Sequence, residues 1–260
     1  MANQQMTGSE ILLKCLVDQD VTEIFGYPGG AVLPIYDAIF NQNALRHILV
    51  RQEAGAVHAA EGYARSTGKV GVVLVTSGPG ATNAVTGLTD ALMDSIPIVC
   101  LTGQVPTHLI GNDAFQEADT VGITRPCTKH NWLVRDVDDL PRILHEAFYV
   151  ATSGRPGPVV VDIPKDVQFA TGTYQGPTPN PAAAHKSYRP QLKGDASSIR
   201  MAAEMMANAK KPVLYTGGGV INSGPQACQL LRELVDATGI PITSTLMGLG
   251  CYPASGKHWL

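Results

Sequence analysis

Short apolar runs alternate with helix-like segments through residues 1–170, and this alternation restricts the fold more than any other feature. The runs 70–77 and 96–103 lack a polar alternation, which is typical of strands buried on both faces. Thr7 and Glu10 have capping-box spacing before an apolar segment. The pattern predicts about six strands joined by helical crossovers, which is a doubly wound parallel α/β sheet.

The domain organisation is predicted from the place where this alternation lapses. Residues 171–195 are rich in Pro, Ala, Gly and Gln, and we interpret them as a linker that follows a first domain at 1–170. The alternation restarts in 196–260, but only two strand-like runs occur there, too few to close a core. We therefore expect 196–260 to be the start of a second α/β domain, and the chain to be the front part of a longer one.

Composition excludes several classes of function. Charged residues make up 16% of the chain, the net charge is -3 and no Lys/Arg run occurs, so nucleic-acid binding has no electrostatic basis. The 5 cysteines show neither C-x-x-C nor zinc spacing, which predicts a reduced protein without a metal site. No apolar run approaches the roughly 20 residues that cross a bilayer. Without a targeting signal at the N-terminus, we expect a cytoplasmic protein with no membrane partner.

Two glycine turns follow predicted strands. The first, Tyr27-Pro28-Gly29-Gly30, lets backbone approach a ligand closely, although a plain strand–helix turn explains it too. The second, residues 77–83, lacks both the Lys-Ser/Thr of a Walker loop and the third glycine of a dinucleotide fingerprint. Its proline stiffens the turn, which suits packing against a flat ring. Because parallel strands end at one rim, we expect the two turns to converge there.

Glu53 lies between a predicted strand and a predicted helix. A carboxylate at a helix N-terminus commonly does no more than stabilise the helix dipole. The small residues 54–56 that follow it would allow a ring to lie close. In an apolar pocket, such a carboxylate can share a proton with a ring nitrogen.

The run 51–104 resembles the pyrimidine-binding domain of thiamine-diphosphate decarboxylases and carboligases. Within that superfamily, the chain is most similar to acetohydroxyacid synthases. The stretches that carry this finer resemblance are 27–39, 103–119, 151–167 and 216–225. The resemblance covers almost the whole chain and weakens only across the predicted linker.

The resemblance implies roles toward thiamine diphosphate. Glu53 matches the glutamate that hydrogen-bonds N1′ of the aminopyrimidine and activates the cofactor, and Gln116 and Gly30 are implied as further catalytic residues. The implied cofactor-binding set is Tyr27, Pro28, Gly29, Glu53, Thr76, Pro79, Asn83 and Gln116. Phe115 and Lys165 match a substrate channel, where a cation can attract a keto-acid carboxylate.

The resemblance also implies FAD, which the family binds without using it for net redox chemistry. The matching FAD contacts are Arg155, Gly217, Gly218, Gly219, Asn222, Thr245 and Leu246. Family members hold Mg²⁺ and the diphosphate through a Gly-Asp-Gly motif in a third domain, and this sequence contains no such motif. The family's site forms between two subunits, so a homodimer or tetramer with a possible regulatory small subunit is implied. We expect the 260-residue segment alone to be inactive.

The implied reaction is the decarboxylation of pyruvate and the ligation of its hydroxyethyl unit to a second 2-keto acid. That acid is pyruvate or 2-ketobutyrate, and the products are precursors of branched-chain amino acids. Two alternatives stay open. One is another thiamine-diphosphate enzyme, such as pyruvate oxidase, oxalyl-CoA decarboxylase or a different 2-keto acid decarboxylase. The other is a non-catalytic domain that keeps the fold for binding or assembly.

Overall fold

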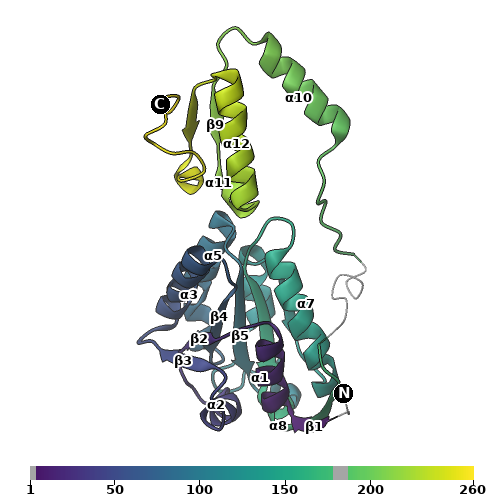
Figure 1. Cartoon of the computed structure of the whole chain (residues 1–260). Coiled ribbons are helices and arrows are strands. Elements are labelled where there is room, and N and C mark those ends of the chain that lie inside the picture. The colour runs from purple at the N-terminus through teal and green to yellow at the C-terminus, as the bar shows by residue number, and fades with distance from the viewer. Residues whose placement is uncertain (1–3, 178–186) are drawn as a thin grey trace. The chain divides into compact units, whose positions relative to one another are not determined.

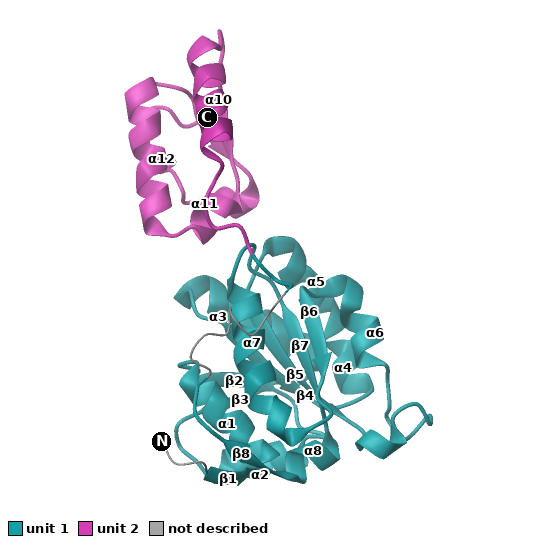
Figure 2. Ribbon diagram, turned by 90° about the vertical axis from the view of Figure 1, so that its right-hand side faces the viewer, with its two compact units in different colours: residues 1–189 teal, residues 190–260 magenta. Residues whose placement is uncertain are grey.

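The computed structural model describes residues 4–177 and 187–260, and the chain divides into two compact units, Met1–Arg189 and Pro190–Leu260 (Figures 1 and 2). Unit 1 is built on a six-stranded sheet and unit 2 on a two-stranded sheet.

The sheet of unit 1 is parallel throughout, with strand order β3-β2-β4-β5-β7-β6. Its strands are β2 (Glu23–Gly26), β3 (Arg46–Leu49), β4 (Gly71–Val75), β5 (Ile98–Gln104), β6 (His130–Leu133) and β7 (Val159–Pro164). The central strands β4, β5 and β7 are buried along their whole length. These findings confirm the doubly wound parallel α/β sheet that the apolar runs predicted.

Helices cover both faces of this sheet (Figure 1). Alternate strand residues such as Val72 and Leu74 join α1 (Gly8–Asp18), α2 (Leu33–Phe40) and α7 (Leu140–Thr152) in one core. On the other face, α3 (Glu53–Thr67) packs against β4, β2 and α5 (Val85–Asp94). The unit also contains α4 (Pro79–Asn83), α6 (Thr120–Thr124) and α8 (Lys165–Phe169), with 3-10 turns η1 (Thr107–Leu109), η2 (Arg125–Cys127) and η3 (Val137–Asp139).

The predicted capping box forms at the start of α1. The Thr7 side chain accepts from the backbone of Glu10, while the Glu10 carboxylate accepts from the backbone N–H of Thr7 at 2.8 Å. This reciprocal pair satisfies two helix-end donors, so α1 begins where the sequence indicated.

A second small sheet in unit 1 was not predicted. Strand β1 (Gln4–Thr7) pairs antiparallel with β8 (Thr171–Tyr174). Both strands are short and largely polar, and their partners lie far apart in the sequence, so no local pattern marks either one. The first four residues of the predicted linker 171–195 therefore form a strand of unit 1, and residues 178–186 of that linker lie outside the described part of the chain.

Unit 2 contains the strand–helix pattern predicted for the start of a second α/β domain. Strands β9 (Leu214–Thr216) and β10 (Ile242–Ser244) pair in parallel. The helices are α10 (Ala196–Asn208), α11 (Gly218–Asn222) and α12 (Pro225–Thr238), followed after β10 by η4 (Leu246–Gly248). The buried core consists of Val235, Ile242, Cys251 and Tyr252. Across the described residues of both units, none of the helices has the length and apolar character needed to cross a membrane.

Candidate functional site

Turns at the carboxyl ends of three adjacent strands converge in unit 1. Tyr27–Gly30 follows β2, Glu53 begins the helix after β3, and Thr76–Gly80 follows β4. These strands are neighbours in the order β3-β2-β4, so the three segments share one edge of the sheet. The edge is where open parallel sheets bind ligands, as the sequence predicted.

Glu53 is the first residue of α3, and only 8% of its surface is exposed. Asn83 Nδ2 donates to Glu53 Oε2 at 2.9 Å. Within residues 4–177 and 187–260, no hydrogen bond reaches Oε1 and no cation lies within ion-pair distance of Glu53. The carboxylate therefore presents one oxygen that is held by a neutral amide and one that can accept from a ligand.

Thr76 locks the two glycine turns together. Its Oγ1 accepts from the backbone N–H of Ala31 at 3.2 Å. A Cβ atom on Gly29 would lie 2.5 Å from Thr76 Cβ, and one on Gly80 would lie 2.7 Å from Thr76 Cγ2. Such distances are far inside van der Waals contact, so only glycine fits at either position without displacing Thr76.

The second turn also contacts the loop between β5 and α6, residues 105–119. Gly78 has a φ of 53°, and a Cβ there would lie 2.4 Å from the carbonyl oxygen of Gln116. Gln116 itself has a φ of 56°, which a non-glycine residue rarely adopts. The backbone of Gln116 thus sits directly against the turn that leads to Asn83, whereas neighbouring Phe115 is 88% exposed.

The cradle around Glu53 has room for a flat group. A Cβ on Gly80 would lie 3.6 Å from Glu53 Oε1, so its absence leaves that oxygen open. Cβ atoms on Gly30 or Gly55 would meet nothing within 4 Å. Tyr27 and Pro79 are exposed at the rim. An open carboxylate oxygen beside glycine turns and exposed rings fits a planar heterocycle such as an aminopyrimidine.

Lys165 follows β7 at the same edge and is half-buried. The next residue, Asp166, accepts from Thr107 N at 3.0 Å and from Thr107 Oγ1 at 2.5 Å. This contact ties the start of the 105–119 loop to the segment that carries Lys165. Lys165 and Phe115, which the sequence assigned to a substrate channel, are therefore carried by two connected segments.

Arg155 has a defined structural task. Its Nε donates to Ser95 Oγ at 2.7 Å, and its Nη2 donates to the carbonyl oxygens of Met93 and Leu92 at 2.8 and 3.2 Å. These bonds cap the carboxyl end of α5. The FAD contact assigned to Arg155 remains a prediction.

The other residues predicted to contact FAD meet at one edge of unit 2. Thr245 N donates to Thr216 O at 2.8 Å, and a Cβ on Gly218 would lie 3.1 Å from Met247 Cβ. The turn after β9 therefore packs against the turn after β10. The predicted residues in these turns are Gly217, Gly218, Gly219, Asn222, Thr245 and Leu246.

A buried polar network beside the 105–119 loop was not predicted from the sequence. Asp162 on β7 is 1% exposed and accepts from Thr102 Oγ1 at 2.6 Å and Gln104 Nε2 at 2.9 Å. Burial raises the pKa of Asp162 to about 7, against the lowering effect of these two hydrogen bonds. The one signal in the sequence was a charged residue inside an otherwise apolar run, 159–164.

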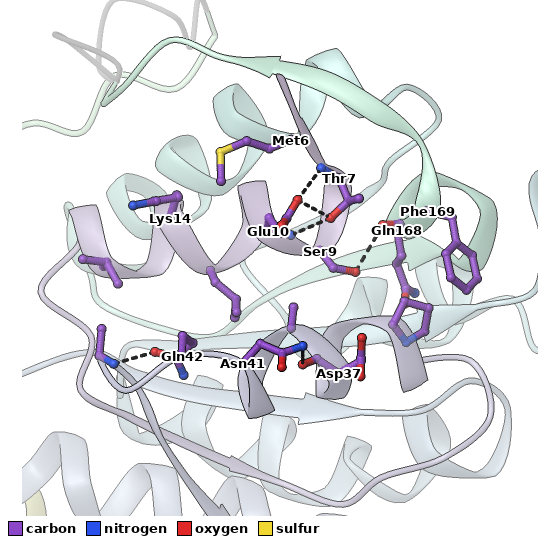
Figure 3. Close-up of a pocket in the computed structure, with 15 residues that line it drawn as sticks. Met6, Thr7, Ser9, Glu10, Lys14, Asp37, Asn41, Gln42, Gln168 and Phe169 are labelled. Atoms are coloured by element: carbon purple, nitrogen blue, oxygen red, sulfur yellow. Dashed lines mark hydrogen bonds between the residues drawn. The ribbon is translucent and has the colours of Figure 1, made fainter. Parts of the chain in front are cut away.

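A separate cavity of about 410 Å³ opens between α1, α2 and α8 (Figure 3). Its lining includes Ser9, Lys14, Asp37, Gln42 and Phe169, and none of the predicted site residues belongs to it. The predicted site residues lie at the strand ends and not in this cavity.

Comparison with known proteins agrees with this geometry. Residues 6–123 match the family model described as the thiamine pyrophosphate enzyme N-terminal TPP binding domain. Residues 199–260 match the model described as the thiamine pyrophosphate enzyme central domain. The first match contains all three turn segments and Gln116, and the second contains the glycine turn of unit 2.

Curated relatives match over nearly the whole chain. An acetolactate synthase large subunit from Mycobacterium tuberculosis is 56% identical over 258 residues, which are 99% of this chain and 41% of that protein. The acetolactate synthase isozyme 3 large subunit from Escherichia coli is 51% identical over 257 residues, 99% of this chain and 44% of that protein. This chain thus spans less than half the length of these relatives. With two models of one family matching in order, the chain belongs to the thiamine pyrophosphate enzymes and carries their N-terminal and central domain sequences.

Proposed function

We propose that this chain carries the cofactor-activating part of a thiamine-diphosphate-dependent acetolactate synthase. The observation that supports the proposal most directly is the setting of Glu53. Its carboxylate is buried and forms no ion pair within residues 4–177 and 187–260. One carboxylate oxygen accepts a hydrogen bond from Asn83, and the other is open. A group in this position can hold a proton at a ring nitrogen without competition from solvent or from an ion pair.

The residues around that carboxylate would each have a separate role toward the cofactor. Glu53 would hold the proton at N1′ of the aminopyrimidine through Oε1, and Asn83 would keep the carboxylate oriented through Oε2. Tyr27, Pro28 and Pro79 would line the ring, while Gly29 and Thr76 fix the turns that carry them. Thiamine diphosphate, once bound, supplies a carbon nucleophile and an electron sink for decarboxylation.

The substrate side of the proposal involves the 105–119 loop and α8. Lys165 would attract the carboxylate of a 2-keto acid, and exposed Phe115 would line the channel. Gln116, whose backbone lies against Gly78, would approach the reacting centre from the loop. Gly30, with open space beside it, would leave room for the substrate.

The names of the relatives support acetolactate as the product. The proposed substrate is pyruvate, and the proposed acceptor is a second pyruvate or 2-ketobutyrate. We further propose that the whole enzyme assembles as a homodimer or tetramer, binds a regulatory small subunit and is located in the cytoplasm. We propose FAD binding at the turns after β9 and β10, with Arg155, and Mg²⁺ binding outside residues 1–260, where a Gly-Asp-Gly motif would lie. We propose that residues 1–170 form the pyrimidine-binding domain, 171–195 the linker and 196–260 the start of the central domain. Strand β8 lies in the linker range but pairs with β1 of the first domain.

The proposal can be tested in a chimera in which this chain replaces the matching part of the Escherichia coli isozyme 3 large subunit. With pyruvate, thiamine diphosphate, Mg²⁺ and FAD, we expect acetolactate to form, and we expect Glu53→Gln in the same chimera to abolish most of it. Consumption of pyruvate to acetaldehyde or acetate instead would favour the alternative decarboxylases and oxidases. A folded chimera that binds the cofactor but leaves pyruvate unchanged would favour a non-catalytic domain.

A further inference from the structure

The 105–119 loop is tied to the rest of unit 1 at both ends. At its start, Asp166 accepts from the backbone and the hydroxyl of Thr107. Near its end, Gln104 Nε2 on β5 donates to the carbonyl oxygen of Ala118 at 2.9 Å. Ala118 is two residues beyond Gln116, so this second tie lies close to the residue that contacts Gly78.

The loop also carries an internal brace. Glu117 accepts from the backbone N–H of Gly111 at 2.5 Å and from that of Ala114 at 2.9 Å. Donation from these two N–H groups holds the pKa of Glu117 below its usual range. The brace keeps the loop's shape but connects only residues within it, so the loop's position depends on its two end ties.

The Gln104 amide has a fixed orientation. Its Nε2 donates to both Asp162 Oδ2 and Ala118 O, and its Oε1 accepts from Val105 N at 2.9 Å. Every donor and acceptor of this 3% exposed side chain is used. A flipped amide would place its oxygen against two acceptors, so the buried carboxylate of Asp162 selects the orientation that holds the loop.

We propose that Gln104 and Asp162 are positioning residues that hold the backbone of Gln116 against Gly78, and thereby place Gln116 at the cofactor site. This inference rests on the proposed function for its last step only. The other titratable groups facing Asp162 are Asp119, at the start of α6, and Cys100 on β5, and neither bonds to its carboxylate.

Thr102 provides a matched control. It donates to the same carboxylate as Gln104, is equally buried and lies on the same strand, but within residues 4–177 and 187–260 its side chain makes no hydrogen bond to the loop. Gln104→Met keeps the length of the side chain and removes both donors. Thr102→Val keeps the shape and removes one donor. Both variants disturb Asp162, and only the first releases Ala118.

The first test measures amide hydrogen exchange in the 260-residue chain, with β5 amides as the reference for global opening. Loss of the bond to Ala118 should raise exchange about fivefold to tenfold in Gln104→Met at Thr120, whose N–H also donates to the carbonyl oxygen of Ala118. Thr102→Val should leave this amide unchanged relative to β5. Equal exchange in the two variants, or no change in either, would overturn the proposal.

The second test measures kinetics in the chimera described above. Gln104→Met should lower kcat for acetolactate about 10- to 100-fold with little change in KM for pyruvate, because misplacing Gln116 affects the chemical step. Thr102→Val should leave kcat unchanged. Asp162→Asn retains one acceptor for Gln104, so its kcat should lie between those of Gln104→Met and Thr102→Val. Unchanged kcat in Gln104→Met would refute the catalytic step of the proposal. An inactive parent chimera with a loosened loop in Gln104→Met would refute the proposed function while leaving the positioning contact intact.

Discussion

The carboxyl edges of the two parallel sheets differ in how they hold polar groups. In unit 1, Glu53, Thr76, Gln104 and Asp162 are all at most 8% exposed, and each has a hydrogen-bond partner within the chain. In unit 2, Leu246 is 81% exposed, and the glycine turn beside it is half-buried or exposed. The larger sheet therefore holds buried polar side chains at its edge, whereas the turns at the edge of the two-stranded sheet stay open to solvent.

The largest effect is expected from removing the charge of Glu53, which tests the role of a buried polar group at the unit 1 edge. In the chimera, Glu53→Gln keeps the side chain's shape and its contact with Asn83, but an amide cannot share the proton of a ring nitrogen. We expect C2 proton exchange of bound thiamine diphosphate, measured by NMR, to slow by roughly 10²–10⁴-fold. Asn83→Ala is the matched control for orientation and should have a smaller effect. Near-normal exchange in Glu53→Gln would contradict the assignment.

A second test challenges the interlocked turns of unit 1. Gly29→Ala forces a methyl group to within 2.5 Å of Thr76 and should lower the free energy of unfolding by about 1–3 kcal/mol. Gly62→Ala on α3 meets nothing within 4 Å, so it should stabilise the chain by about 0.5–1 kcal/mol through helix propensity. Urea denaturation monitored by circular dichroism measures both. If the two substitutions change the free energy of unfolding in the same direction, the predicted clash at Gly29 is wrong.

Titration of Asp162 gives a test of how deeply the unit 1 edge is buried. The pKa of Asp162 is about 7 in the folded state and 3.8 in the unfolded chain. Between pH 3.8 and pH 7, the folded state therefore keeps a proton on Asp162 that the unfolded chain has lost. The stability of the native protein should therefore fall as the pH rises from 5 to 8, by roughly 2–3 kcal/mol from this group. Asp162→Asn should flatten that slope in denaturant titrations at each pH. A slope that is unchanged in the variant would show that Asp162 does not titrate in this range.

The smallest expected effect concerns unit 2. Its core cluster has only four buried hydrophobic side chains, so we expect amides of β9 and β10 to exchange faster than those of β4 and β5. Leu230→Ser, on an exposed part of α12, should change the free energy of unfolding by no more than about 0.5 kcal/mol. Equal protection in the two sheets would remove the contrast between the units.

The sequence predicted what depends on local pattern. The central strands β4, β5 and β7 lie in largely apolar runs of the sequence, and the approach of Gly29 to the turn containing Gly80 follows from the rule that parallel strands end at one edge. The pairing of β1 with β8 and the bond from Gln104 to Ala118 were missed. Neither contact has a periodic signal in the sequence, because each joins residues that are far apart or that meet through a backbone carbonyl. The left-handed conformation of Gln116 likewise has no signature in its residue type.

The close packing of Gly29, Thr76 and Gly80 has an evolutionary consequence. A larger residue at position 29 or 80 requires a smaller one at 76, so the change at 76 must come first, and it leaves a void until the second change follows. The three positions should therefore vary as a group across related sequences, with intermediate combinations strongly depleted. Diversity would then accumulate at open positions away from this edge, such as Gly62 on α3, where an added side chain displaces nothing in this chain.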